Sequence, residues 1–230
     1  MEAEVSVLDD YVLSLAPARE PRICLLPTAG GDSEEQIRRF RIAFGDRLCA
    51  PSVVSLFRLG REPVPLREHL LAQDVIYVGG GCVRSCLGTW RAHGLDDVLR
   101  EAWARGIVMC GLSAGSLCWF EQGLTAFHGE QGLPVAGLGV LMGSNAVHYD
   151  KEPRRRPDYH SAIAAGMPPG WAADDGAALH FVGEDLARVV SSRRESKAYR
   201  GESVNDEVVE LALPVTYLGA ADAAEPALAA

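Results

Sequence analysis

The chain has 230 residues, of which 48% are hydrophobic and 23% are charged, a balance typical of ordinary globular proteins that excludes intrinsic disorder over most of the chain. Its 22 basic and 31 acidic residues give a net charge of −9, which opposes binding to nucleic acid or to an anionic membrane surface. We expect a single domain over residues 1–219, followed by a disordered Ala-rich tail over residues 220–230.

No apolar run approaches the roughly 20 residues that a membrane-spanning helix needs, and the first residues lack the basic and apolar parts of a signal peptide. We therefore expect a cytoplasmic protein in which the six cysteines are reduced thiols. Cys82 and Cys86 are close in the sequence, but no second Cys or His cluster completes a zinc site. The sequence predicts no metal and no other cofactor.

The first half of the chain alternates short apolar runs with amphipathic stretches, as strands alternate with helices in an α/β fold. Because the apolar runs are continuous, both faces of each strand should be buried, which is typical of a parallel sheet covered by helices on both sides. The expected strands are residues 22–26, 52–57, 74–78 and 106–110, and the expected helices are residues 34–44, 66–72, 84–93 and 95–105.

The second half is less regular, because Gly and Pro are frequent between residues 123 and 169. Residues 153–157, a basic stretch between two prolines, interrupt the pattern. Apolar residues predict strands at residues 171–182, 187–191 and 204–213.

The sequence Gly-Leu-Ser-Ala-Gly at residues 111–115 follows an expected strand and precedes the apolar helical residues 116–120. This is the nucleophile-elbow pattern, in which a tight turn presents the central residue above the sheet and the flanking glycines relieve crowding. Ser113 would be exposed to substrate, and the N–H of Ala114 would point toward a developing oxyanion. We interpret Ser113 as a nucleophile in preference to a structural turn.

A second oxyanion donor is expected from the three glycines at residues 79–81, which end the preceding strand. Adjacent parallel strands release their loops at the same edge of the sheet, so these glycines and the elbow can face each other. A phosphate-binding turn is the alternative interpretation, but the Lys-Ser/Thr pair of a P-loop does not follow.

A serine nucleophile needs a base, and the chain has six histidines. His148 is the first choice, because it ends a short strand-like run beyond the elbow, where a loop at the carboxyl edge of the sheet would begin. His180 alternates with apolar residues, which favours a half-buried position in a sheet. His69 and His93 lie in polar helical stretches and are expected to be solvated.

Several motifs, in this order, resemble the peptidase E and cyanophycinase family of serine peptidases. They are Tyr-Val-Gly-Gly-Gly at residues 77–81, the elbow with Cys-Trp-Phe-Glu at residues 118–121, His-Tyr-Asp at residues 148–150, and Asp-Asp-Gly-Ala-Ala-Leu-His-Phe at residues 174–181. The resemblance extends over residues 8–199. It implies a flavodoxin-like three-layer α/β sandwich with a mostly parallel sheet, related to class I glutamine amidotransferases, with serine at the elbow in place of cysteine.

By this resemblance, Ser113 is the nucleophile, His148 is the base, and the N–H groups of Gly81 and Ala114 form the oxyanion hole. Family members cleave after an N-terminal aspartate in dipeptides, or after the aspartates of cyanophycin. The resemblance therefore implies a small peptide as substrate.

An acidic substrate and a protein of net charge −9 require a local basic patch. The resemblance places the residue that reads the aspartate near Arg155 or Arg156, and a guanidinium group suits that task because it binds a carboxylate through two hydrogen bonds. The other interpretation of this stretch is a solvated run of charges.

The chain departs from the family's pattern after the three glycines and after the elbow helix. Cys82 and Val83 stand where the family usually has Asn-Thr, and Ala126 stands where related sequences carry an acid. The acid that orients the base is therefore sought nearby. Glu130, in the same loop, is preferred, and Glu121, at the end of the elbow helix, is the alternative.

Family members also begin with a strand and a glycine-rich turn before the equivalent of Leu8, and we expect this first strand to be missing from the sheet. A sheet edge left open in this way needs a partner to cover it. A homodimer is therefore one expectation.

Two functions are compatible with these motifs. The first is a serine hydrolase resembling alpha-aspartyl dipeptidase, in which Ser113 attacks a peptide carbonyl and His148 moves the proton. The second is a catalytically weak or inactive descendant that binds a small molecule or a partner, as the departures from the family's pattern would allow. An esterase of the α/β-hydrolase type would share the elbow but would need His180 as its base.

Overall fold

The structure, a computed structural model, describes residues 6–127, 129, 131–205 and 207–219. The tail expected over residues 220–230 lies outside these residues. The first described element is helix α1 (Val7–Ser14), and within the described residues no strand precedes it. The expectation that the sheet lacks the family's first strand stays a prediction.

The first half of the chain is built around a four-stranded parallel sheet in the order β2-β1-β3-β4. Its strands are β1 (Arg22–Leu26), β2 (Ala50–Val53), β3 (Val75–Val78) and β4 (Val108–Gly111). All of β3 is buried, and so is β1 after its first residue. The expected α/β architecture, a parallel sheet buried on both faces, is confirmed.

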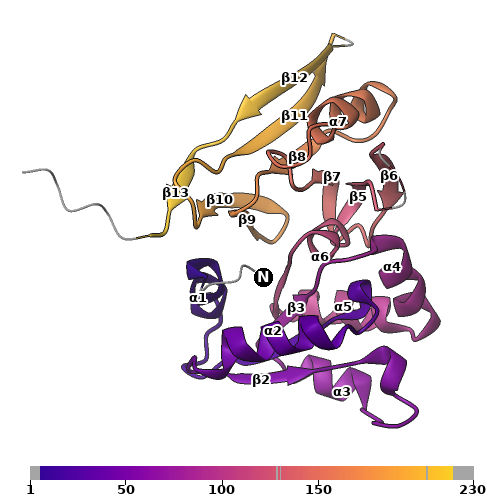
Figure 1. Cartoon of the computed structure of the whole chain (residues 1–230), viewed down its shortest axis with the longest axis vertical. Helices are drawn as coiled ribbons and strands as arrows, with labels where there is room; N and C mark the ends of the chain where they lie inside the picture. The colour runs from indigo at the N-terminus through magenta and orange to yellow at the C-terminus, as the bar shows by residue number, and fades with distance from the viewer. Residues whose placement is uncertain (1–5, 128, 130, 206, 220–230) are drawn as a thin grey trace, which may run out of the picture.

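Helices cover both faces of this sheet (Figure 1). In chain order the helical elements after α1 are η1 (Thr28–Gly30), α2 (Glu34–Gly45), η2 (Leu56–Arg58), α3 (Leu66–Leu71), α4 (Val83–Ala92) and α5 (Leu95–Ala104). Leu25 of β1 belongs to the same buried cluster as Phe40 of α2, whereas Leu26 belongs to the cluster of Trp90 in α4, because successive side chains of a strand point to opposite faces. The longest of these helices, α2, has 12 residues, and nowhere in the described part of the chain is a helix long and apolar enough to cross a membrane.

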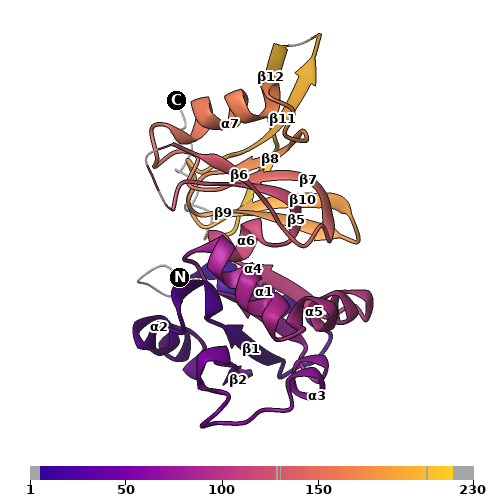
Figure 2. The same ribbon diagram turned by 90° about the vertical axis from the view of Figure 1, so that its right-hand side faces the viewer.

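The second half of the chain forms two further sheets, which Figures 1 and 2 place at the other end of the molecule from the parallel sheet. One is a six-stranded mixed sheet in the order β12-β11-β8-β7-β5-β6, and the other is a three-stranded sheet in the order β13-β10-β9. Their elements are β5 (Phe120–Thr125), β6 (Leu133–Ala136), β7 (Leu141–Ala146), α7 (Arg155–Ala164), β8 (Gly170–Ala173), β9 (Ala177–Val182), β10 (Asp185–Ser191), β11 (Ala198–Val204), β12 (Glu207–Ala212) and β13 (Val215–Tyr217).

One hydrophobic cluster connects the parallel sheet with these further sheets. It contains Leu26 and Val78 of the parallel strands and Leu117 of the short helix α6 (Ala114–Leu117), and it continues through Phe120 of β5 and Leu141 of β7. Helix α6 lies between the two ends of the molecule (Figure 1). Residues at the start of α6 are therefore placed where the sheets meet.

Several elements of the second half differ from the sequence-based expectation. Residues 171–182 form two strands, β8 and β9, because a turn at residues 174–176 separates them. Residues 204–213 contain β12 and only the end of β11, since the two strands form an antiparallel pair. The helix after the elbow has only four residues, because Phe120 already begins β5, which pairs with β6 and β7. Glu121 therefore lies in a strand and not at the end of a helix.

The sequence does not predict helix α7, because residues 153–157 contain two prolines. Pro157 is the third residue of the helix. Backbone N–H groups in the first turn have no partner within a helix, so proline is tolerated there. Tyr159 and Ile163, one turn apart, are buried against the six-stranded sheet in a cluster with Leu124 and Ala172. Burial of this face stabilises the helix, although its prolines predict an interruption of regular secondary structure.

Candidate active site

The turn between β4 and α6 has the backbone of a nucleophile elbow. Ser113, at its centre, has φ 54° and ψ −119°, a conformation that residues with a Cβ rarely adopt. A Cβ on Gly111 would lie 2.3 Å from the carbonyl oxygen of Gly115, and a Cβ on Gly115 would lie 2.2 Å from that of Val78. Both flanking positions of the motif therefore require glycine.

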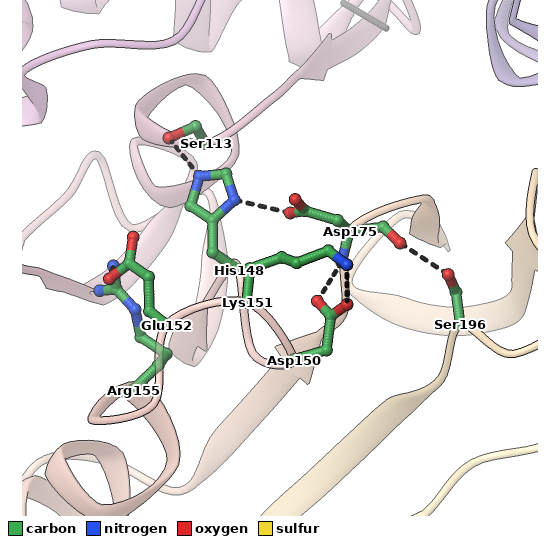
Figure 3. Close-up of polar contacts among 8 residues, drawn as sticks. All are labelled: Ser113, His148, Asp150, Lys151, Glu152, Arg155, Asp175 and Ser196. Atoms are coloured by element: carbon green, nitrogen blue, oxygen red, sulfur yellow. Dashed lines mark hydrogen bonds and ion pairs between the residues drawn. The ribbon is translucent and has the colours of Figure 1, made fainter.

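The side chain of Ser113 is hydrogen-bonded to His148. Ser113 Oγ lies 3.0 Å from His148 Nε2 (Figure 3). His148 follows β7 and also has a positive φ, 56°. Its carbonyl accepts hydrogen bonds from the N–H groups of Lys151 and Glu152, at 3.2 and 3.1 Å. This turn fixes the imidazole toward the elbow, as expected for the base that the sequence predicts.

A carboxylate occupies the other side of the imidazole. Asp175 Oδ1 lies 2.6 Å from His148 Nδ1, and the two side chains are each one-third exposed. Because a carboxylate accepts but does not donate, Nδ1 carries the proton, which leaves Nε2 free to accept from Ser113. The three side chains thus form a continuous hydrogen-bonded chain from nucleophile to acid, which the geometry of a Ser-His-Asp triad requires.

The loop that carries Asp175 is held from both sides. Its N–H donates to Asp150 Oδ1 at 2.9 Å, and its carbonyl accepts from Ser196 Oγ at 2.6 Å. Asp150 also pairs with Lys151, at 3.5 Å (Figure 3). Asp175 is therefore positioned by the loop that follows His148 and by the loop before β11.

The glycine loop, residues 79–81, lies against the elbow. A Cβ on Gly80 would meet the Leu112 side chain at 2.9 Å and Ser113 Cβ at 3.3 Å. Gly81 has φ 139°, and a Cβ there would lie 2.1 Å from the carbonyl oxygen of Ala29, so this position also requires glycine. Among the described residues, the N–H groups of Gly81 and Ala114 have no hydrogen-bond partner. Both remain available to bind an oxyanion.

The sequence patterns do not predict Asp175 as the acid beside His148. The expected acid, Glu130, lies outside the described residues. The alternative, Glu121, accepts a hydrogen bond from the N–H of Gly143 at 3.3 Å within the sheet. Asp-Gly at residues 175–176 is a turn signal that could have marked the end of β8 and the acid there.

The two arginines expected to bind substrate are both engaged by protein groups. Arg155 is only 5% exposed, donates to the carbonyl of Leu124 at 2.9 Å, and pairs with Glu152. Its guanidinium therefore supports the loop after His148. A role for Arg155 in binding substrate stays a prediction.

Arg156 lies in a cluster with Tyr149, Tyr199 and Glu210. Its guanidinium is 4.7 Å from the centroid of the Tyr149 ring and 4.6 Å from that of Tyr199, and Nη1 lies 2.5 Å from Glu210 Oε1. Glu210 also accepts from Tyr149 Oη at 2.5 Å and contacts His160 Nε2 at 3.0 Å. Burial and the neighbouring Glu210 raise the pKa of Tyr149. The substrate role of Arg156 also stays a prediction.

The alternative base, His180, is bonded elsewhere. Its Nδ1 lies 2.7 Å from Tyr11 Oη of α1, and its ring stands edge-on to the tyrosine ring. Burial lowers the pKa of His180, with Arg188 as a smaller cause. The hydrogen bonds of Ser113 and His180 thus favour His148 as the base.

The described residues contain no group of three or more His, Cys, Asp or Glu side chains that could hold a metal ion. Within the described residues the six cysteines form no disulfide, and five of them are buried. Cys82, which stands where the family has Asn, accepts hydrogen bonds through Sγ from the N–H and Oγ of Ser85 at 3.5 and 3.3 Å. The thiol thus caps α4 in place of an amide.

The sequence and the fold are both similar to those of known peptidases. The family model for peptidase family S51 matches residues 1–189. An uncharacterized peptidase of Bacillus subtilis (strain 168), YgaJ, is 47% identical over 220 residues, which are 95% of this chain and 94% of the relative.

Two solved structures have a similar fold. The structure of a peptidase from an acI-B1 Actinobacterium aligns with a TM-score of 0.67 at 19% identity, covering 92% of each chain. A putative peptidase E protein from Listeria monocytogenes EGD-e aligns with a TM-score of 0.52 at 16% identity, covering 91% of this chain and 96% of that one. The family model and the Bacillus relative together cover nearly the whole sequence, and the chain belongs to peptidase family S51.

Proposed function

We propose that this S51 peptidase is a serine peptidase that cleaves short peptides after an N-terminal aspartate. The hydrogen-bonded chain from Ser113 Oγ through His148 to Asp175 carries the proposal. The preference for aspartate is supported by the resemblance of the motifs to the peptidase E family.

In the proposed reaction, Ser113 Oγ attacks the carbonyl carbon of the scissile peptide bond while His148 Nε2 takes the hydroxyl proton. Asp175 stabilises the resulting imidazolium through Nδ1. The negative charge that develops on the carbonyl oxygen is stabilised by the N–H groups of Gly81 and Ala114, each worth about 100- to 1000-fold in rate.

The tetrahedral intermediate collapses when the C–N bond breaks and His148 returns the proton to the leaving amine. The aspartyl group is now an ester of Ser113. Water then attacks this ester, with His148 taking a proton from the water, and the free acid leaves as Ser113 regains its proton.

The first experiment measures hydrolysis of Asp-Leu, Asn-Leu and Leu-Leu by the purified protein. We expect cleavage of Asp-Leu, and we expect Ser113→Ala to lose at least about 1000-fold in kcat/KM. Ser161→Ala, on an exposed position of α7, is the matched control and should retain the wild-type rate. Equal cleavage of Asp-Leu by Ser113→Ala would overturn the serine mechanism.

A binding module without catalysis is the second candidate, because Cys82 and Val83 replace residues of the family's glycine loop. Labelling with a fluorophosphonate separates the two candidates, since the reagent reacts only with an activated serine. Labelling of the wild type but not of Ser113→Ala supports the hydrolase. The cap that Cys82 supplies to α4 favours an intact glycine loop and therefore also supports the hydrolase.

A further inference from the structure

A cavity of about 340 Å³ lies between α2 and the loops at the carboxyl ends of the parallel strands. Its lining residues come from the loop after β1, from the first turns of α2, from the glycine loop and from the elbow. They are Gly30, Ser33, Glu35, Gln36, Arg39, Gly79 and Leu112. None of these side chains takes part in the proton transfers of the proposed reaction.

The cavity adjoins the reacting centre through two of its walls. Leu112 directly precedes Ser113, and Gly79 begins the glycine loop that ends at Gly81. Gln36 Nε2 donates to the carbonyl of Gly80 at 3.1 Å, which ties α2 to the same loop. Since one extended residue spans about 3.5 Å, a group one or two residues from a scissile bond at Ser113 can reach this cavity.

Arg39 brings a positive charge to the cavity, beside the carboxylate of Glu35, which also lines it. Arg39 Nε lies 2.7 Å from Glu35 Oε1, and Arg38 makes hydrogen bonds of 2.8 and 2.9 Å to the two oxygens of the same carboxylate. The hydrogen bonds from Arg38 and then Arg39 lower the pKa of Glu35 to about 2. Arg38 and Arg39 therefore share one carboxylate, so the three side chains together carry one net positive charge in a protein whose net charge is −9.

Side-chain hydrogen-bond donors that line the cavity are also available to a ligand. Within the described part of the chain, the two terminal nitrogens of Arg39 form no hydrogen bond, and Ser33 makes no side-chain capping bond to α2. A guanidinium whose two terminal nitrogens have no partner can bind a carboxylate through two parallel hydrogen bonds. Arg38, by contrast, does not line this cavity.

We propose that this cavity is a substrate subsite in which Arg39 binds a carboxylate of the peptide. The inference rests on the proposed function and adds a residue that binds the acidic substrate. An aspartyl dipeptide has two such groups, the aspartate side chain and the C-terminal carboxylate.

The test compares Arg39→Gln with Arg38→Gln, a matched control because both arginines belong to α2 and share Glu35. Each variant is assayed on Asp-Leu, on Asn-Leu, which lacks the side-chain carboxylate, and on Asp-Leu amide, which lacks the C-terminal one. We expect Arg39→Gln to raise KM for Asp-Leu at least tenfold with little change in kcat, and Arg38→Gln to change KM less than twofold. If Arg39→Gln leaves KM for Asn-Leu unchanged, Arg39 binds the side-chain carboxylate of the aspartate. If it leaves KM for Asp-Leu amide unchanged, Arg39 binds the C-terminal carboxylate.

The same variants are compared in binding, with Asp-Leu titrated by calorimetry into Ser113→Ala protein with and without Arg39→Gln. If the wild type hydrolyses Asp-Leu but Arg39→Gln changes neither KM nor the dissociation constant, the subsite inference is wrong and the proposed function stands. If the wild type hydrolyses no aspartyl dipeptide but Asp-Leu binds in an Arg39-dependent way, the proposed function is wrong and the subsite stands.

Discussion

Tyr11 and His180, which are 169 residues apart in the chain, share a hydrogen bond of 2.7 Å between Oη and Nδ1. The bond joins α1, which packs on the parallel sheet, to β9 of the three-stranded sheet. It also engages the histidine that an α/β-hydrolase mechanism would use as its base. His180 therefore has a structural role, and this role has a measurable dependence on pH.

We expect protonation of His180 to destabilise the protein. Burial and, to a smaller extent, Arg188 lower the pKa of His180, so below the ordinary value of about 6.5 the unfolded chain binds this proton more readily than the folded protein does. The free energy of unfolding should therefore decrease as the pH falls from about 7.5 to about 5.5. Urea unfolding at both pH values measures the decrease.

In His180→Gln, which keeps a hydrogen-bonding side chain toward Tyr11, the free energy of unfolding should decrease less between these pH values than in the wild type. Part of the decrease in the free energy of unfolding remains, because burial also lowers the pKa of His69. His93→Gln, at an exposed position of the chain, serves as the control and should behave as the wild type. Identical pH dependence in the wild type and in His180→Gln would contradict the role of this histidine.

Replacement of Asp175 should reduce the rate of the chemical step. Asp175→Asn keeps the size of the side chain but removes the charge that stabilises the imidazolium and fixes the proton on Nδ1, so we expect kcat to fall by about 100- to 10,000-fold. KM for Asp-Leu should change little. If Glu130→Gln lost this activity and Asp175→Asn did not, the acid would be Glu130 and the assignment of Asp175 would be wrong.

Gly81→Ala should displace the glycine loop, because the new Cβ would lie 2.1 Å from the carbonyl oxygen of Ala29 and the φ of 139° strains any other residue. We expect a loss of stability of about 1–3 kcal/mol together with a lower kcat. Gly88→Ala is the matched control, since a Cβ there meets nothing within 4 Å. Because Gly88 lies inside α4, alanine should stabilise the protein by about 0.5–1 kcal/mol. Thermal unfolding and dipeptide hydrolysis measure both effects.

Glu210→Ala should destabilise the protein and reduce activity together. The side chain of Glu210 is 13% exposed and binds both Tyr149 and Arg156, so its removal leaves the hydroxyl of the buried Tyr149 without this acceptor, at a cost of about 1–3 kcal/mol. Activity should fall because Tyr149 adjoins His148 in the chain. Glu202→Ala breaks a more exposed pair with Arg200 and should cost less than about 1 kcal/mol. Equal losses in the two variants would show that the Glu210 cluster has no special role.

The residues of the elbow and the glycine loop can be predicted because their requirements are local. Close approach of backbone atoms at Gly111 and Gly115 leaves no room for a Cβ, and this requirement appears in the sequence as a motif. The proposed base, His148, can be predicted from its place after an expected strand.

The proposed acid and the proposed substrate-binding residues depend on packing between distant segments. Asp175 reaches His148 because β7 and β8 are neighbours in the six-stranded sheet, and no local pattern specifies that pairing. The sequence leaves open whether Arg155 binds substrate or is a solvated charge, whereas the folded chain buries it and pairs it with Glu152 in the loop after His148. Arg39 lies in a helix whose charged face looks ordinary until the cavity beside the glycine loop is known.

The proposed nucleophile and its two partners belong to different sheets. Ser113 follows a strand of the parallel sheet, whereas His148 and Asp175 follow strands of the six-stranded sheet, and one hydrophobic cluster holds these sheets together. A slight loosening of that cluster would separate Oγ from Nε2 before either sheet loses its own hydrogen bonds. The rate of peptide hydrolysis would then report whether the two ends of the molecule are packed together. On heating, the enzyme would lose its activity at a temperature at which its circular dichroism is still unchanged.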